Sequence, residues 1–335
     1  MHLRLCVPDI SAHPTGGNHY NTAIRAAWPA PDEVDPHTGW PPSPSNADAW
    51  LVDSLLVRTP EMPRVLMDAP PAVLLLHYLH LVDPTQAHIE AIMQEAQYVQ
   101  RFAGCVVPSR FVARQLTEHG VPTDRIRVAV PGLSAAYRHG PRPASTLEPP
   151  FQLLTVANLL PNKQLVACLR MLETLDEVPW TWRIIGDDTL DSVYATEVQT
   201  AVQDSPVRDR ITLSGAQPAE AVRTAYDNAD VVLCPSRFET SSMVAREALA
   251  CGVPVLGFRV GGLPETLGPT ASDGLVAPKD FDALATRLQE LLTTPTRYRA
   301  WHHEAIRASR GIPSWSETAR RVRHAVRAFA ELPSS

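Results

Sequence analysis

The sequence predicts an α/β protein with two doubly wound domains, each a parallel β-sheet covered by helices on both faces. Three observations predict this fold class. Short apolar, β-rich runs alternate with helical patterns nearly throughout the chain, as they do in parallel sheets. The chain has 335 residues, 44% of them hydrophobic, which suits two cores of about 150 residues each. A proline-rich stretch separates two such alternating series.

The first series supplies an N-terminal domain, which we place at residues 1–148. Its expected strands are 3–7, 49–54, 72–78, 104–109 and 126–130. Its expected helices are 17–28, 86–101 and 109–119. Prolines cluster at 29–45 and 141–150, and we interpret both segments as loops or linkers.

The second series supplies a second domain, which we place at residues 149–312. Its expected strands are 151–157, 181–186, 211–215, 230–236 and 254–258. Its expected helices are 163–175, 191–203, 217–228, 242–251 and 281–293. In this architecture ligands bind beyond the carboxyl ends of the strands, so the cleft between the two domains is the expected site.

Residues 313–335 form the last predicted element. The segment begins with a Ser-x-x-Glu pattern, and its apolar residues recur with a helical rhythm at Val322, Ala325, Val326 and Phe329. This pattern predicts a terminal helix packed on one of the domains, with the N-terminal domain as one choice.

Composition restricts the function classes. The net charge of −6 gives no general attraction to nucleic acid or anionic lipid, so a phosphate ligand needs a local site. The five cysteines are scattered in apolar runs, which favours buried free thiols in a reducing compartment. No signal segment and no apolar run of about 18 residues is present, so we expect a cytoplasmic protein, with peripheral membrane contact left open.

The segment 236–256 carries two glutamates, Glu239 and Glu247, with seven residues between them. A strand leads into this loop, and a helix follows, with Ser241 or Ser242 as its cap and Gly252 at its end. Amides of the first helical turn form an anion site, and carboxylates can accept hydrogen bonds from neighbouring sugar hydroxyls. The alternative is that Glu239 only favours the helix dipole and Glu247 pairs with a base in solvent.

Further candidate residues lie at or after the ends of strands in the predicted sheets. Lys163 can neutralise a leaving diphosphate, or it is a solvated lysine at a helix start. Gly16 and Gly17 allow close backbone approach to a phosphate or sugar, or they form an ordinary turn. His77 ends an apolar strand better than His80 does, although a lone histidine there is commonly structural. Asp53 has a similar strand-end location and a weaker claim.

The segment PSRFETSSMVAREALACGVPVLGFRVGGLPE (235–265) resembles the C-terminal signature of the retaining GT-B glycosyltransferases of family 4, the group 1 glycosyltransferases. That signature is a Glu-x7-Glu pair followed by Gly-x-Pro-Val and Gly-Gly-x-x-Glu, and the match covers about 30 residues with correct spacing throughout. Weaker similarity extends over nearly the whole chain. The resemblance implies a GT-B fold, with an acceptor domain at 1–148 and a nucleotide-sugar donor domain at 149–312.

The resemblance also implies roles for particular residues. Glu239 and His77 would contact the donor sugar, and Glu247 the ribose of the nucleotide. Diphosphate oxygens would be held by Lys163, by Arg237 and by the backbone of Ser241, Ser242 and Met243, with Gly16 and Gly17 near the donor. Gly186, in a Gly-Asp pair after a strand, would lie near the base.

The chain departs from the family pattern at two places. Asn158 stands where members commonly carry an arginine, and Thr-Ser-Ser-Met (240–243) replaces the usual Gly-Phe-Gly-Leu. Asn158 can donate only a neutral hydrogen bond to a phosphate. Side chains in place of glycines near the donor leave the donor sugar undetermined.

The predicted function is transfer of a sugar from a nucleotide diphosphate donor, of the UDP or GDP type, to an acceptor hydroxyl with retention of anomeric configuration. No cofactor or metal is expected, since the Cys-x-x-Cys and His-x-x-x-His spacings of metal sites are absent. The acceptor, whether glycan, lipid or small molecule, is undetermined. The alternatives are a sugar-nucleotide epimerase or sugar phosphorylase of the same fold, and a degenerate module that only binds sugar.

Overall fold

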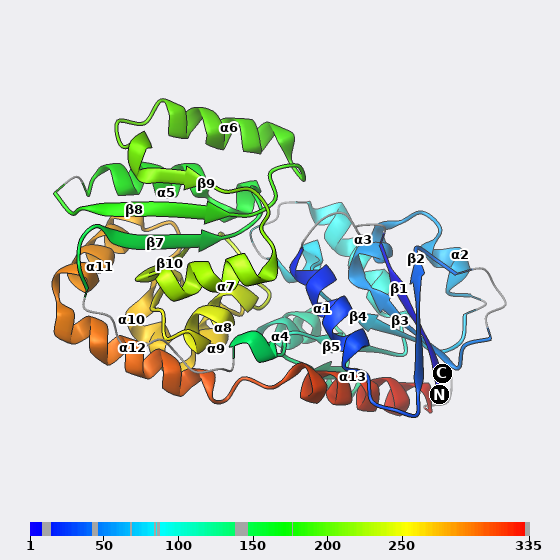
Figure 1. Ribbon diagram of the computed structural model, residues 1–335. Helices are drawn as coiled ribbons and strands as arrows, with labels where there is room; N and C mark the ends of the chain where they lie inside the picture. Colours follow the sequence, from blue (N-terminus) through cyan, green and yellow to red (C-terminus); the bar gives the residue numbers. More distant parts are fainter. Residues whose placement is uncertain are drawn as a thin grey trace. The chain divides into compact units, whose positions relative to one another are not determined.

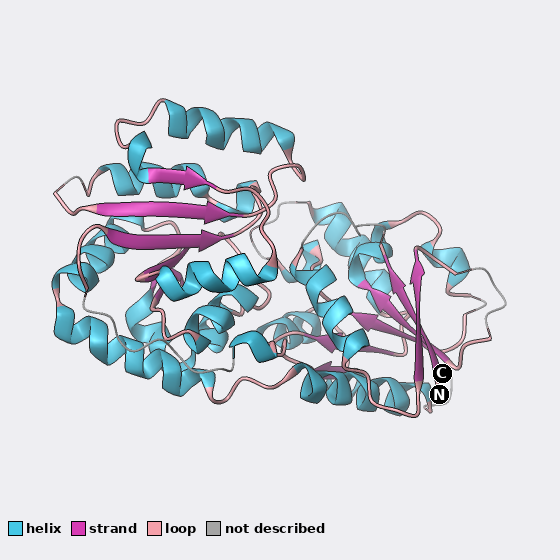
Figure 2. Cartoon of the chain, viewed as in Figure 1, coloured by secondary structure: helices cyan, strands magenta, loops and turns pink. Residues whose placement is uncertain are grey.

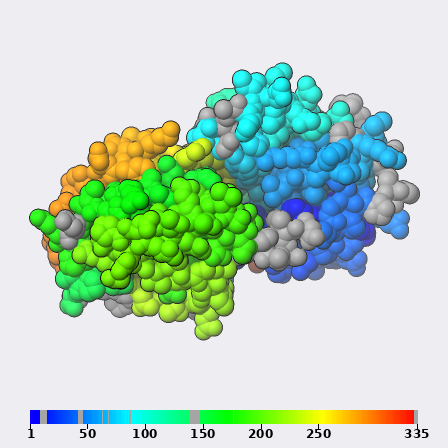
Figure 3. All heavy atoms as spheres, turned by 90° about the horizontal axis from the view of Figure 1, so that it is seen from above, coloured from blue at the N-terminus to red at the C-terminus, as the bar shows by residue number. Residues whose placement is uncertain are grey.

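The computed structural model describes residues 1–8, 15–41, 46–67, 69–83, 85, 88–137, 147–175 and 177–331. The chain forms two compact units: Met1–Gly132 together with Pro313–Ser335, and Leu133–Ile312. Helices and strands alternate in both (Figures 1 and 2). In the space-filling view the first unit is mainly blue and cyan, and the second is green to orange (Figure 3). The predicted α/β class with two parallel-sheet, Rossmann-like domains is confirmed.

The first unit contains a six-stranded sheet in the order β2-β1-β3-β4-β5-β6, and its paired strands are parallel. The strands are β1 (His2–Val7), β2 (Glu33–Thr38), β3 (Ala49–Asp53), β4 (Ala72–Leu75), β5 (Gly104–Val107) and β6 (Ile126–Val128). Its α-helices are α1 (Gly16–Ala26), α2 (Met62–Val65), α3 (Ile89–Val99), α4 (Arg110–Glu118) and α13 (Trp315–Ala330).

The edge strand β2 corrects one expectation. The proline-rich sequence predicts a loop at residues 29–45, but Glu33–Thr38 pair in parallel with β1 along all six residues, Pro36 opposite Leu5. The proline obscured the strand pattern. A proline fits here because an edge strand is hydrogen-bonded on one side only, so the missing amide hydrogen can face away from the sheet.

Helix α13 completes the core of the first unit. Its Ser314–Glu317 capping box is present, and the predicted apolar positions Val322, Ala325, Val326 and Phe329 are buried against the first sheet. A side chain at Gly104 on β5 would overlap the Phe329 ring. The buried Asp32 carboxylate accepts hydrogen bonds from Arg323 at 2.6 Å and from Arg327 at 2.7 Å, so it fixes the helix to the loop before β2.

The second unit also contains a six-stranded sheet, in the order β12-β11-β10-β7-β8-β9, with parallel pairs. Its strands are β7 (Phe151–Val156), β8 (Trp180–Ile185), β9 (Ile211–Leu213), β10 (Val231–Cys234), β11 (Val255–Phe258) and β12 (Leu275–Val276). Its α-helices are α5 (Leu165–Glu173), α6 (Ser192–Gln203), α7 (Ala219–Asn228), α8 (Met243–Ala250), α9 (Leu263–Leu267), α10 (Ala271–Gly274), α11 (Phe281–Thr293) and α12 (Pro295–Ser309).

The start of the second unit lies before the sequence-based boundary at 148/149. Leu133 and Tyr137 are buried in a cluster with residues of α7, α8 and β10, so the chain already belongs to the second core at these positions. Residues 141–146 of the proposed proline-rich linker lie outside the described part of the chain.

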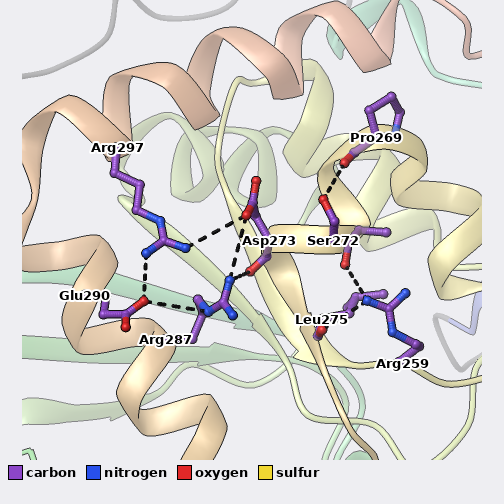
Figure 4. Close-up of polar contacts among 9 residues, drawn as sticks. Arg259, Pro269, Ser272, Asp273, Leu275, Arg287, Glu290 and Arg297 are labelled. Carbon is purple, nitrogen blue, oxygen red and sulfur yellow. Dashed lines mark hydrogen bonds and ion pairs between the residues drawn. The ribbon is translucent and has the colours of Figure 1, made fainter.

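Helix α12 and the strand β12 were not predicted. An ion-pair network joins this region on the surface: Asp273 on α10 lies near Arg287 of α11 and Arg297 of α12, and Glu290 accepts from Arg297 at 2.7 Å (Figure 4). Arg259, after β11, donates to the carbonyl oxygens of Ala271 and Leu275 (Figure 4).

Each sheet has one point where the strand order reverses. The first chain segment runs outward from β1 to β2 and then continues on the other side of β1 with β3. The second runs from β7 to β8 and β9 and continues on the other side of β7 with β10. Ligands of doubly wound sheets bind at the carboxyl ends of the strands at such points.

All five cysteines are buried and unpaired, as expected from the sequence. Among the described residues, no helix has both the length and the apolar character needed to cross a membrane.

Candidate functional site

In the second unit, Lys163 and Glu239 meet at the point where the strand order reverses. Lys163 ends a short 3-10 helix (Pro161–Lys163) after β7, and Glu239 follows β10. The Lys163 Nζ lies 2.7 Å from Glu239 Oε1. The two side chains are 21% and 14% exposed, so this ion pair is accessible to a ligand.

The loop that carries Glu239 is held by its backbone. The amide of Arg237 donates to the Asn162 carbonyl at 2.8 Å, and the amide of Gly262 donates to the Glu239 carbonyl at 2.7 Å. Gly261 has a φ of 53°, and a Cβ there would overlap the Glu239 carbonyl oxygen. The Gly-Gly pair of the sequence motif therefore fixes the loop before the helix α8.

Helix α8 begins as the sequence predicts. Ser242 is the N-cap, and its Oγ accepts from the amide of Ala245. Ser241 Oγ accepts from Arg246 Nη2 at 2.7 Å. Amides of a first helical turn have no acceptor within their own helix, so Met243 and its neighbours present donors and a positive dipole end beside Glu239.

Arg237 lies in the same loop. Its side chain is half-buried, and its guanidinium makes no hydrogen bond or ion pair with another described residue. Because it has no partner among the described residues, this guanidinium offers the loop a second cation besides Lys163.

Glu247, on α8, is bound by tyrosines. Tyr226 Oη on α7 donates to Glu247 Oε2 at 3.1 Å, and the Tyr137 hydroxyl also hydrogen-bonds the carboxyl. Burial raises the pKa of Glu247 to about 7, although both hydrogen bonds lower it. Glu247 therefore does not lie in solvent against a base, which was the alternative reading of the sequence.

Asn158 and Gly186 lie together where β7 and β8 end. The Asn158 Oδ1 accepts from the backbone amide of Asp187 at 3.1 Å, so it joins the loops that follow the two strands. A Cβ at Gly186 would overlap the Ala157 carbonyl oxygen. This glycine is thus required for close approach of the two strand ends.

In the first unit, the predicted residues gather at the end of β1, β3 and β4. Gly16 and Gly17 form the first turn of α1, capped by Thr15. A Cβ at Gly17 would lie 3.1 Å from the His77 ring, so the glycine leaves room for the imidazole. The ring is mostly buried, with 12% of the side chain exposed.

His77 is held by residues that the sequence analysis missed or ranked low. His77 Nε2 lies 2.9 Å from Asn21 Oδ1, and Asn21 Nδ2 donates to Asp53 Oδ2 at 2.7 Å. The Asp53 side chain is fully buried. Burial lowers the pKa of His77, and the charge of Asp53 partly opposes this.

The predicted residues therefore form two groups, one in each unit. The first unit holds Gly16, Gly17 and His77, and the second holds Lys163, Arg237, Glu239, Glu247 and the start of α8, with Asn158 and Gly186 at adjacent strand ends. Sequence reasoning missed Asn21, Tyr137 and Tyr226. Asn21 could have been found, because it follows Gly17 by four residues and so shares its helical face. The tyrosines give no local signal.

Among the described residues, no three His, Cys, Asp or Glu side chains gather so as to hold a metal ion.

A family model and several curated proteins match this chain. Residues 142–308 match the family model described as "Glycosyl transferases group 1". A D-inositol 3-phosphate glycosyltransferase of Segniliparus rotundus is 29% identical over 243 residues, 69% of this chain and 53% of that protein. The chain spans about half the length of the curated relatives it matches.

Solved structures share the fold. Sucrose-phosphate synthase of Thermosynechococcus elongatus superposes with a TM-score of 0.81 at 19% identity, covering 98% of this chain and 99% of that one. HepE of Anabaena, solved in complex with UDP-glucose, gives a TM-score of 0.80 at 14% identity, covering 98% of this chain and 100% of that one. The two units therefore have the GT-B fold expected from the sequence.

Proposed function

We propose, from the match of residues 142–308 to the family model of the group 1 glycosyltransferases, that the protein transfers a sugar from a nucleotide diphosphate donor to an acceptor hydroxyl. We further propose that transfer proceeds with retention of anomeric configuration and without a metal. The observation that carries the proposal is the Lys163–Glu239 pair, 2.7 Å apart beside the N-terminus of α8.

The first requirement of this chemistry is to stabilise the negative charge that develops on the leaving diphosphate. Cleavage of the glycosyl–phosphate bond leaves negative charge on the phosphate and positive charge on the sugar. Lys163, Arg237 and the first-turn amides of α8 supply fixed positive charge and donors on the phosphate side. These protein groups take the place that a divalent metal occupies in other sites.

Glu239 binds the sugar in this proposal. Its carboxylate can accept hydrogen bonds from two neighbouring hydroxyl groups of the sugar. Its ion pair with Lys163 places it beside the cation proposed to bind the phosphates. The same ion pair makes Glu239 a poor nucleophile. We therefore propose a front-face route, in which the departing phosphate oxygen takes the proton of the acceptor hydroxyl, in place of a covalent intermediate.

Glu247 would hold the nucleotide, because its carboxylate can accept hydrogen bonds from the two ribose hydroxyls. Tyr226 fixes the orientation of this carboxylate at 3.1 Å. Gly186, at the end of β8, would lie near the base. A uridine or guanosine diphosphate fits this proposal, and UDP is favoured because the similar fold of HepE was solved with UDP-glucose.

The first unit would contribute the acceptor domain, with His77 near the donor sugar and Gly16 and Gly17 near the phosphates. The acceptor is a glycan, a lipid or a small molecule, and a peripheral membrane contact suits the second of these. The five buried thiols fit work in a reducing compartment such as the cytoplasm.

A donor panel tests the proposal. We expect one class among UDP- and GDP-sugars to raise the melting temperature of the protein. That donor is then incubated with and without a set of acceptor alcohols, with EDTA present throughout, and the anomeric configuration of the product is read from its proton NMR coupling.

Each alternative predicts a different result. Donor hydrolysis and acceptor-dependent product support the transferase. A changed sugar nucleotide without acceptor indicates an epimerase, and inorganic phosphate dependence indicates a phosphorylase. Stabilisation without any turnover indicates the degenerate binding module. This alternative is included because Asn158 and the Thr240–Met243 segment depart from the family pattern.

A further inference from the structure

A buried hydrogen-bond relay supports His77 in the first unit. It runs from Asp53, at the end of β3, through Asn21 on α1 to the imidazole of His77. Asn21 is 4% exposed and Asp53 is not exposed at all. The two contacts measure 2.7 Å from Asn21 Nδ2 to Asp53 Oδ2 and 2.9 Å from Asn21 Oδ1 to His77 Nε2.

The carboxylate determines how the amide of Asn21 is oriented. An ionised carboxylate only accepts hydrogen bonds, and Asp53 already accepts from the amide of Leu55 at 2.9 Å with its other oxygen. If the Asn21 amide were turned over, two acceptor oxygens would face each other at 2.7 Å. The Asn21 nitrogen must therefore point at Asp53, and its oxygen at His77.

The orientation of Asn21 in turn fixes the tautomer of His77. An amide oxygen can only accept, so His77 Nε2 carries the hydrogen. In the neutral ring, Nδ1 is then an acceptor. No described residue hydrogen-bonds this nitrogen, and 12% of the His77 side chain is exposed.

The environment also keeps the ring neutral. The ring is mostly buried and packs edge-on against Tyr20, with centroids 5.2 Å apart. Asp53 Oδ2 lies 3.6 Å from His77 Nε2, beyond a normal hydrogen bond, and the neutral amide of Asn21 provides the direct contact instead. A carboxylate in direct contact would favour the imidazolium form.

We propose that Asn21 and Asp53 are positioning residues that hold His77 as the Nε2–H tautomer, so that its Nδ1 accepts a hydrogen bond from a hydroxyl of the donor sugar. This inference rests on the proposed function for the identity of the ligand. In this role His77 accepts a hydrogen bond from a sugar hydroxyl and does not act as a general acid. Ser54 supports the same geometry, since its Oγ accepts from the backbone amides of His77 and Tyr78.

Nitrogen-15 NMR of the histidine rings tests the tautomer in the wild-type protein. The chain has 12 histidines, and the His77 signals are assigned as those that vanish in His77→Gln. We expect a protonated Nε2 whose hydrogen exchanges slowly with water, and an unprotonated Nδ1, near neutral pH. Protonation at Nδ1 in that pH range would overturn the inference.

Ligand binding tests the positioning role. In Asn21→Leu we expect the affinity for the full sugar nucleotide to fall roughly tenfold, the loss of about one hydrogen bond. The affinity for the nucleoside diphosphate without sugar should stay unchanged, as should both affinities in Thr22→Ala, an exposed position on the same helix. Equal losses for both ligands in Asn21→Leu would show a merely structural role and overturn the proposal.

The two proposals fail in different ways. If the wild-type protein turns over no sugar nucleotide, while the tautomer and the sugar-dependent affinity are as stated, the transferase proposal fails and the relay stands. If turnover is normal but Asn21→Leu and wild type bind the sugar nucleotide equally well, the relay proposal fails alone.

Discussion

The two points of reversed strand order hold their polar groups in opposite ways. In the first unit, Asp53, Asn21 and His77 bond to one another below the surface, and Asp53 is fully buried. In the second unit, Lys163 and Glu239 are partly exposed on loops. The buried relay orients the His77 ring and presents little charge to a ligand. The partly exposed side chains of Lys163 and Glu239 offer charges that a ligand can contact. Removing the buried Asp53 acceptor should therefore lower stability in the first region, and removing a partly exposed charge should lower turnover in the second.

The largest effect is expected at Lys163. In Lys163→Met, loss of the cation that neutralises the leaving diphosphate should lower kcat by roughly 100- to 1000-fold. The free energy of unfolding should change by less than about 1 kcal/mol, because the pair with Glu239 is partly exposed. Initial rates of nucleotide release measure the first quantity, and chemical denaturation the second.

Lys279→Met is the matched control, since Lys279 is the other lysine of the chain and lies in the same unit. Its kcat should equal that of the wild type. If kcat fell less than threefold in Lys163→Met, Lys163 would not supply the charge that neutralises the leaving diphosphate.

The fold could be predicted from the sequence because strand–helix alternation is a local pattern, and the Glu-x7-Glu spacing identified the charged residues that we propose for the site. Ser242 as helix cap, Gly252 in the left-handed conformation and the apolar face of α13 are confirmed for the same reason. The edge strand β2 was missed because Pro36 made its segment look like a loop.

The partners of the polar side chains could not be predicted. Asn21 contacts His77 across 56 residues, and Tyr226 contacts Glu247 across 21. Such contacts depend on how strands and helices pack, which no short pattern encodes. The roles of the site residues accordingly stay predictions until ligand binding is measured.

An intermediate effect is expected at Asp53. In Asp53→Leu, Asn21 Nδ2 and the Leu55 amide lose their buried acceptor, which should cost about 2 kcal/mol. Hydrogen exchange of β3 and β4 should then become about 30-fold faster, while exchange of β10 should not change.

Arg237→Ala is the counterpart in the second unit. Its guanidinium has no described protein partner, so the free energy of unfolding should stay within about 0.5 kcal/mol of the wild type. If this variant destabilised the protein as much as Asp53→Leu does, the contrast between the two regions would not hold.

The smallest effect is a pH dependence of nucleotide affinity through Glu247. Burial raises the pKa of this carboxyl to about 7, so it is ionised above that pH and takes up a proton below it. A protonated carboxyl is a poor acceptor of hydrogen bonds from the ribose hydroxyls. We therefore expect the affinity for a nucleoside diphosphate to fall by up to about tenfold per pH unit below 7. Calorimetric titration with UDP and GDP measures this.

Two variants separate Glu247 from the titration of the ligand itself. Glu247→Gln should bind more weakly and keep only the pH dependence of the diphosphate. Tyr226→Phe removes a hydrogen bond that favours the ionised carboxyl, so the fall in affinity should begin at a higher pH. Unchanged affinity and the same pH profile in Glu247→Gln would rule out the ribose contact.

Helix α13 has a consequence for synthesis of the protein. The core of the first unit includes Val322, Val326 and Phe329, which the ribosome adds some 190 residues after Gly132. Residues 133–312, by contrast, are continuous in the chain. All segments of the second unit are therefore synthesised before α13, whereas the first unit lacks part of its core until α13 is made. The unit that begins the chain is thus the last to have all of its core segments.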